Sequence, residues 1–323
     1  MDLNDRFNAL DDNLKLDVAE RARAITAHNR LSAVLVTAGV AKRTRLQGSF
    51  ARKTMLPPLH DIDKVVELVD ELRDLLDGPA GPAKAIDLIR DTLEPHFPGA
   101  TFDVKKHALG IVLPGDGFDF DAVPAFNPDD SSGWISIADT EDADWEPSNT
   151  YMLIDTISTR NQACDGRFVH QVRMVKQAVS TAGLADILPG LHAETFVFEA
   201  VTASMQHPDA VSATLATGAA LLGGPYTEPT GVDLISSRLK PTDVAAAKAA
   251  LARLAQLAAE AVRLAAAGDE TAAAHIWADI FGEAFPRPTG EEAFIQGLYG
   301  AGVATTSPSP ARATPTTRAW RPA

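Results

Sequence analysis

The sequence contains a single cysteine, Cys164, among its 323 residues. A lone thiol cannot form an internal disulfide, and it excludes a zinc cluster built from several cysteines. Long apolar runs are also missing, since charged residues interrupt every stretch that approaches the length of a membrane-spanning helix. The first residues carry no basic segment leading into an apolar one, as a secretory leader does. We therefore expect a cytoplasmic protein without a membrane segment.

Basic residues are scarce relative to acidic ones. The chain has 29 Lys and Arg against 43 Asp and Glu, which gives a formal net charge of -14. Broad binding to a nucleic-acid backbone is driven by clustered Lys and Arg, so strong binding to a duplex is not expected. Residues 42–60 are an exception, with five basic residues and no acidic one: Lys42, Arg43, Arg45, Arg52 and Lys53. A local positive rim of this kind suits a small polyanion such as a nucleoside triphosphate.

The spacing of apolar residues predicts a sheet-containing first half. A helix is expected over residues 13–38 with Gly39 as its stop, followed by a strand around Ile62 and a helix over residues 82–93. Further strands are predicted over residues 100–104, 108–113 and 118–123, and residues 114–117 (Pro-Gly-Asp-Gly) are typical of a hairpin turn between the last two.

The second half has a helical pattern from about residue 149 onward, after a loop over residues 127–133. The clearest helices are expected over residues 167–181, 192–206 and 243–267, the last with Thr242 as its N-cap and Gly268 as its stop. The predicted fold class is therefore α+β, a mixed sheet flanked by helices followed by an all-helical C-terminal lobe. We expect a core with an N-terminal bracing helix (1–150), a helical lobe that closes the cleft (151–303) and a Pro/Thr-rich disordered tail (304–323).

Two carboxylates, Asp61 and Asp63, lie two residues apart in the predicted strand. Alternate side chains of a strand share a face, so both can bind one divalent ion. A later predicted strand carries Asp121, which offers a third ligand, and Asp119 is the alternative one pleat away. Nucleotidyl transfer builds charge on the entering and leaving oxygens, and two Mg²⁺ or Mn²⁺ ions roughly 3.5–4 Å apart can stabilise both.

A turn formed by Gln47, Gly48 and Ser49 precedes these carboxylates by about a dozen residues. Gly48 lets the backbone approach a phosphate without a clash, and the hydroxyl and amide of Ser49 can donate to phosphate oxygens. Neither the turn nor the Asp-x-Asp pair is specific alone. Together with Asp121 they predict a metal-dependent nucleotidyltransferase.

These segments also carry a family resemblance. Residues 47–54 (QGSFARKT), 61–63 (DID) and 121–126 (DAVPAF) resemble the bacterial CD-NTases, cyclic-oligonucleotide synthases related to cGAS and oligoadenylate synthase, over roughly residues 10–290. The Asp-x-x-Pro-Ala-Phe form favours Asp121 as the third ligand. Residues 173–176 (RMVK) resemble an Arg-x-x-Lys element whose lysine, here Lys176, approaches the donor triphosphate; a solvated helix lysine is the alternative.

The resemblance implies a polymerase-beta-like nucleotidyltransferase fold and an enzyme that joins ATP, or GTP, UTP or CTP, into a cyclic di- or trinucleotide in antiphage signalling. Some relatives present a flexible C-terminus to a ubiquitin-like conjugation partner, so the tail is expected to meet a conjugation or regulatory partner, with an unstructured end as the alternative. Tyr151 is expected to stack on a base, with a packing role as its alternative, and Glu194 to be a structural hydrogen-bonding partner.

Two rival functions stay open: a nucleotidyltransferase that modifies RNA (a tRNA end) or a protein, and a catalytically silent nucleotide-binding or partner-binding module.

Overall fold

The structure is a computed structural model that describes residues 1–127 and 133–290. Met1–Arg287 form one compact unit, and of the second unit, Pro288–Ala323, only residues 288–290 are described. The predicted tail over residues 304–323 lies outside the described residues, as does most of the predicted loop over residues 127–133. The domain boundaries at residues 150 and 303 stay predictions. No helix among the described residues is long and apolar enough to span a membrane.

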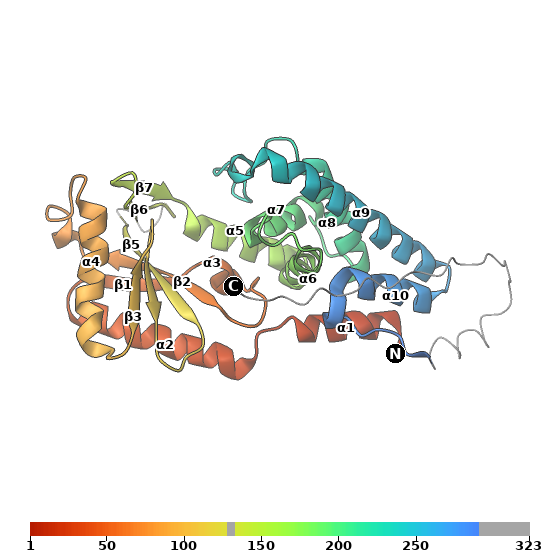
Figure 1. The fold of residues 1–323 in the computed structure, drawn as a ribbon, viewed down its shortest axis with the longest axis horizontal. Coiled ribbons are helices and arrows are strands. Elements are labelled where there is room, and N and C mark those ends of the chain that lie inside the picture. The colour runs from red at the N-terminus through yellow and green to blue at the C-terminus, as the bar shows by residue number, and fades with distance from the viewer. Residues whose placement is uncertain (128–132, 291–323) are drawn as a thin grey trace, which may run out of the picture. The chain divides into compact units, whose positions relative to one another are not determined.

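Seven strands of the described residues form one mixed sheet (Figure 1). The order is β1-β2-β5-β4-β3, with β6 paired to the end of β5 and β7 paired to β6. Strands β2 and β5 are parallel, and the other neighbours are antiparallel. The strands are β1 (Ala41–Leu46), β2 (Asp61–Leu68), β3 (Thr101–Val104), β4 (Leu109–Val112), β5 (Asp119–Phe126), β6 (Ile135–Asp139) and β7 (Asp144–Ser148).

Ten α-helices surround and follow the sheet in the described chain. They are α1 (Leu3–Asn13), α2 (Val18–Thr37), α3 (Gly48–Arg52), α4 (Gly81–Leu93), α5 (Thr150–Ala163), α6 (Phe168–Thr181), α7 (Gly190–Ala200), α8 (His207–Leu221), α9 (Pro241–Ala266) and α10 (Glu270–Phe281). Short 3₁₀ turns lie at Asp70–Leu72, Glu94–His96, Ile235–Arg238 and Gly282–Ala284. The predicted α+β class, a mixed sheet with flanking helices and a helical C-terminal lobe, is confirmed.

One face of the sheet is covered by α2 and α4 (Figure 1). Side chains alternate along a strand, so Ile62 and Val66 of β2 and Phe120 of β5 point to this side, where they are fully buried with Leu31 of α2 and Ile89 of α4. Burial of this apolar face fixes the register of β2 and β5. The opposite face of the same two strands is therefore left for the polar residues between them.

The helical lobe has its own core, and the first helix of the chain belongs to it. Phe7 of α1 packs edge-on against Trp277, Phe281 and Phe285, with ring centroids 5.2, 6.0 and 5.3 Å away. Edge-to-face aromatic pairs of this kind add to the burial of their apolar area. Helix α1 is thus part of the C-terminal lobe, which the periodicity of the N-terminal sequence did not indicate.

The single helix predicted over residues 13–38 is wrong at its start. Two helices, α1 and α2, meet at a break between residues 14 and 17, because the Asp17 carboxylate accepts the backbone N–H groups of Ala19 and Glu20 and caps α2 there. The buried face of α2 contains Leu31 and Leu35, whereas Val18 at its start is exposed. Its predicted stop is confirmed, since Gly39 follows with φ +71°.

Two further boundaries differ from the prediction. Helix α7 ends at Ala200 rather than at residue 206, and α8 begins at His207. Thr242 is not an N-cap, because α9 already begins at Pro241, and proline is favoured in a first turn where its missing N–H is not needed. The stop at Gly268 is confirmed, with φ +86°. Strands β1, β6 and β7 were not predicted.

Candidate functional site

Four carboxylates lie on one face of the parallel pair β2 and β5. Asp61 pairs with Asp119 and Asp63 with Asp121 in the register of the two strands. The intervening residues point to the opposite face and are buried there. The structure therefore brings the three predicted ligands to one place, and it also brings Asp119.

The electrostatics of this face reflect the crowding of like charges. Burial raises the pKa of Asp63, and the negative charges of Asp61 and Asp121 raise it further. Like charges within a few ångströms disfavour the ionised form of each other. A bound cation would relieve this repulsion, and a set of oxygen ligands is the kind that Mg²⁺ or Mn²⁺ takes in proteins.

Lys105 already supplies one positive charge to this face. Its Nζ lies 2.6 Å from Oδ1 of Asp121, and this hydrogen bond raises the pKa of the lysine. The ammonium group neutralises Asp121 as a divalent cation would. Sequence analysis missed Lys105, which lies in the turn between β3 and β4, and no motif singled it out.

The carboxylate oxygens of the three predicted ligands do not all lie within 4.8 Å of one another. Among the described residues, one group has three ligand atoms that all lie within 4.8 Å of one another, and it is His107, Asp139 and Glu146. The aspartates of β2 and β5 carry the right donor atoms on one face, with Lys105 bound to one of them. Their chemistry and register fit a divalent cation, and the geometry of coordination is not formed.

The Gly48 turn lies directly against these carboxylates. Gly48 has φ +64°, and a Cβ built on it would lie 1.8 Å from Oδ2 of Asp63. The backbone N–H of Gln47 also donates to the Asp63 carbonyl oxygen over 2.9 Å. Glycine is thus needed here both for the left-handed backbone and for the approach of Asp63. The sequence predicted a close approach at Gly48, but to a phosphate rather than to Asp63.

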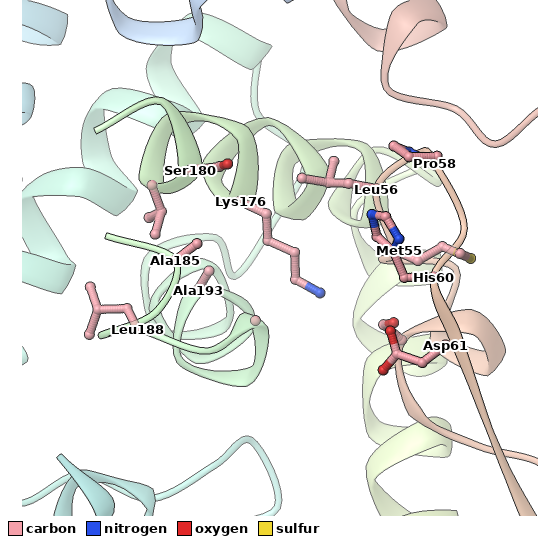
Figure 2. Close-up of a pocket in the computed structure, with 13 residues that line it drawn as sticks. Met55, Leu56, Pro58, His60, Asp61, Lys176, Ser180, Ala185, Leu188 and Ala193 are labelled. Atoms are coloured by element: carbon pink, nitrogen blue, oxygen red, sulfur yellow. The ribbon is translucent and has the colours of Figure 1, made fainter. Parts of the chain in front are cut away.

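A cleft of about 250 Å³ adjoins the carboxylates. Ser49, Asp61 and Lys176 of α6 are among the residues that line it, and Figure 2 shows the Lys176 side chain extending toward the side where Asp61 lies. The remaining lining residues are mostly apolar or small: Met55, Leu56, Pro58, His60, Val179, Ser180, Ala185, Leu188, Gly190 and Ala193. The cleft therefore has one acidic wall and one basic group, which suits a phosphate-bearing ligand next to a cation.

Lys176 is part of a buried charge network centred on Glu194 of α7. The carboxylate of Glu194 is fully buried and accepts from Lys176 Nζ at 2.7 Å, Arg52 Nε at 2.7 Å and Thr54 Oγ1 at 2.8 Å. Burial alone would raise the pKa of Glu194, but Lys176 and Arg52 outweigh it and lower the pKa to about 2. The expectation that Glu194 is a hydrogen-bonding partner is confirmed. Because Arg52 belongs to α3, the network fastens the Gly48 helix to the helical lobe.

Tyr151 lies apart from the cleft, in a small core on the same face of the sheet. It is 9% exposed, its hydroxyl donates to Glu67 over 2.7 Å, and the Arg45 guanidinium lies 4.7 Å from its ring centroid. A stacking role toward a base stays a prediction. In the structure its ring stacks with an arginine.

The basic rim predicted over residues 42–60 is largely paired with acidic groups. Arg43 and Arg45 contact the buried carboxylate of Glu67 at 2.8 and 3.2 Å, and Arg52 contacts Glu194. A buried carboxylate needs such counter-charges. These arginines therefore stabilise the fold, and the positive rim is smaller than the sequence indicated.

The first half of the chain resembles a known protein family. Residues 1–161 match the sequence model of the Second Messenger Oligonucleotide or Dinucleotide Synthetase domain. No curated protein matches the chain significantly.

Solved structures share the fold along most of the chain. CdnC from E. coli MS115-1, in its complex with HORMA-deltaN, has a TM-score of 0.69 at 17% identity and covers 88% of this chain and 98% of its own. CdnG from Bradyrhizobium diazoefficiens, a CD-NTase solved with GTP, has a TM-score of 0.66 at 15% identity, over 86% of this chain and 95% of its own. The cyclic AMP-GMP synthase DncV from Vibrio cholerae, solved with the linear intermediate pppA(3',5')pG, has a TM-score of 0.58 at 15% identity and covers 76% of this chain and 69% of its own. The sheet and the helical lobe thus have a known common architecture.

Proposed function

The chain belongs to the bacterial CD-NTase family through its second messenger oligonucleotide or dinucleotide synthetase domain, and we propose that it joins nucleoside triphosphates into a cyclic di- or trinucleotide with release of pyrophosphate. The observation that carries this proposal is the pairing of Asp63 with Asp121 across parallel strands, beside a cleft that Lys176 lines. ATP is the expected substrate, with GTP, UTP or CTP as partners in the ring.

The reaction is a displacement at the α-phosphorus of one triphosphate. A hydroxyl oxygen of the acceptor forms the new phosphodiester bond, the bond from the α-phosphorus to the pyrophosphate oxygen breaks, and the hydroxyl proton is lost to a base. Asp121 would orient the acceptor hydroxyl and would accept this proton. Ser49 and Lys176 would bind the leaving phosphates from the two walls of the cleft.

Asp61, Asp63 and Asp121 would hold two Mg²⁺ or Mn²⁺ ions, which supply charge stabilisation to the entering and leaving oxygens when bound. Burial and the charges of Asp61 and Asp121 raise the pKa of Asp63, and a bound cation would relieve that repulsion, which supports this assignment. Lys105 would release Asp121 when the ions bind.

A cyclic dinucleotide needs two successive transfers on different hydroxyls, and a cyclic trinucleotide needs three. The linear dinucleotide captured in DncV is the kind of species that the first transfer would form here, and its own hydroxyl would then become the acceptor. Lys176 would rebind the remaining triphosphate for the second transfer. The product would act in antiphage signalling by activating an effector.

The rivals are separated by one experiment. Purified full-length protein is incubated with Mg²⁺ or Mn²⁺ and the four nucleoside triphosphates, and the products are treated with phosphatase. Phosphatase-resistant oligonucleotides formed without added RNA or protein support the synthase, and mass spectrometry then gives the bases and the ring size. Label found on RNA or protein instead would favour a modifying transferase, and no turnover would favour a silent binding module.

The control for this experiment is the loss of one carboxylate. Asp61→Ala and Asp63→Ala, each checked for an unchanged circular dichroism spectrum, should make no product. Retained turnover in both variants would refute the assignment of these residues as ligands.

We also propose a regulatory or conjugation partner. CdnC was solved as a complex with HORMA-deltaN, which shows that a protein of this fold can bind a partner chain. For this chain the expected contact is the segment 304–323, outside the described residues. Deleting residues 304–323 should leave synthesis in vitro unchanged and should weaken defence in cells; defence at the wild-type level would argue against a partner there.

A further inference from the structure

A second cluster of metal-ligating side chains lies away from the cleft carboxylates, where the β6–β7 hairpin meets the turn before β4. His107 precedes β4, Asp139 ends β6 and Glu146 lies on β7. One ligand atom from each lies within 4.8 Å of the other two. We propose that His107, Asp139 and Glu146 form a binding site for a transition-metal dication of the Zn²⁺ type.

The buried carboxylate of Asp139 is the centre of this site. Its side chain is fully buried, one oxygen accepts the backbone N–H groups of Glu141 and Asp142, and the other, Oδ2, accepts no hydrogen bond of good geometry. Oδ2 lies 3.0 Å from the Lys106 ammonium and 4.0 Å from Nδ1 of His107, and this Nδ1 lies 3.0 Å from the Ala138 carbonyl oxygen. A buried carboxylate oxygen needs a positive partner, and here that partner is a lysine whose side chain is 36% exposed. With an imidazole and a second carboxylate close by, a metal ion can take the place of the lysine at this oxygen.

Two carboxylates this close need a positive group or a proton between them. Burial would raise the pKa of Asp139, but the backbone N–H of Asp142 and the Lys106 ammonium outweigh it and lower the pKa. Burial and the hydrogen bond with Asp139 raise the pKa of Glu146. A cation bound between the two carboxylates would relieve their mutual repulsion.

Lys106 is the competing cation at this site. Its Nζ lies 3.0 Å from Oδ2 of Asp139, and it also lies 3.4 Å from Asp142 and 3.7 Å from Glu141. The lysine can therefore keep two exposed carboxylates as partners when a metal ion takes Asp139.

The donor set decides the class of metal. One imidazole and two carboxylates suit Zn²⁺ and its transition-metal neighbours better than Mg²⁺ or Ca²⁺, which take oxygen ligands alone. Zinc with bonds of about 2.0–2.2 Å to nitrogen and oxygen places tetrahedral ligand atoms roughly 3.4 Å apart. The distances between the three ligand atoms, which are at most 4.8 Å, would shorten by at most about 1.4 Å when zinc binds. Rotation of the side chains can supply a movement of this size. Water would complete the coordination.

The site would fasten the turn that carries Lys105. Thr140, next to Asp139, already donates its backbone N–H to the Lys106 carbonyl oxygen over 2.9 Å. A metal ion bound by His107 and the hairpin would strengthen this link. The turn holds Lys105 against Asp121, so the site would stabilise the rim of the cleft without taking part in the reaction.

The test measures metal content and not activity. Full-length Asp63→Ala protein, which removes a cleft ligand, is titrated with ZnCl₂ in excess Mg²⁺ by isothermal titration calorimetry and is then dialysed for metal analysis. One tightly held zinc per chain is expected, with affinity falling about 100-fold or more when His107→Ala or Glu146→Gln is added. Gln has nearly the same shape as the Glu146 side chain, so this variant should fold normally.

Two controls sharpen the test. His96→Ala removes an exposed histidine elsewhere and should leave zinc affinity unchanged, whereas Lys106→Ala should raise it, because the competing ammonium is gone. The proposal is overturned if no zinc is retained at micromolar free metal, if His107→Ala and Glu146→Gln bind it as tightly as their parent, or if Lys106→Ala weakens binding.

Discussion

Substitution of Gly48 by alanine tests the contact between the Gly48 turn and Asp63. The new Cβ would lie 1.8 Å from Oδ2 of Asp63, so the carboxylate must move by about 1.6 Å to reach an ordinary contact of 3.4 Å. Misplacing a group by about 1 Å can lower an enzymatic rate roughly 100-fold. We expect Gly48→Ala to lower kcat for cyclic-nucleotide synthesis by about 100-fold or more.

The same substitution also forces alanine into a left-handed backbone, which costs about 1–3 kcal/mol of stability by itself. Gly39→Ala is the matched control, because Gly39 has φ +71° and no atom within 4 Å of its Cβ. Both variants should lose unfolding free energy in urea through this backbone strain, with a larger loss for Gly48→Ala because of its added clash, and Gly39→Ala should keep its kcat. A Gly48→Ala enzyme with wild-type kcat, or a Gly39→Ala enzyme that is equally inactive, would refute the reasoning.

Three further predictions concern the charges around the cleft. Glu194→Gln leaves two buried cations without their counter-charge and should lower the free energy of unfolding by about 3–5 kcal/mol at pH 7. The folded pKa of Glu194 is lowered to about 2 from 4.5, so the stability that its charge contributes is present above pH 4.5 and is lost as the pH falls toward 2. The difference in unfolding free energy between wild type and Glu194→Gln, measured in urea, should therefore narrow over that pH range. A difference that does not change with pH would contradict the ion pairing of Glu194. Lys105→Met removes the ammonium that pairs with Asp121 and should lower the Mg²⁺ concentration for half-maximal activity several-fold, and an increase in that concentration would show that Lys105 does not compete with the metal. Asp121→Ala should abolish product formation in the phosphatase assay, whereas Asp119→Ala should reduce it only slightly. The opposite result would show that the third ligand is Asp119 and not Asp121.

The site could be predicted from sequence where local pattern decides geometry. A strand places alternate residues on one face, so the spacing of two residues was enough to predict that Asp61 and Asp63 share a face. The meeting of Asp63 with Asp121 depends on strand pairing across more than fifty residues, and the Asp-x-x-Pro-Ala-Phe motif pointed to it through family resemblance. Lys105 had no such motif, because a turn lysine reaches its partner only after the sheet has formed.

The strands β1, β6 and β7 show where local pattern fails. Strand β1 is Ala-Lys-Arg-Thr-Arg-Leu, with three basic residues in six, and its arginines become acceptable in a sheet because Glu67 is buried beside them. Strand β7 contains a proline and two acidic residues and lies at an edge of the sheet, where a missing N–H is tolerated. The single helix predicted over residues 13–38 was wrong for a related reason. The helical spacing of apolar residues is nearly continuous there, but the Asp17 cap starts a new helix.

The packing of Phe7 on the aromatic side chains near residue 280 also constrains how the chain can fold during synthesis. Roughly 270 residues separate Phe7 from Trp277, and a ribosome that adds about 5–20 residues per second needs some 14–54 s to make them. The sheet can form within that interval, whereas α1 must wait, exposed, for its partners. A ribosome-bound chain stalled before residue 270 should therefore present α1 as a protease-sensitive, chaperone-accessible segment, and release of the full chain should bury it.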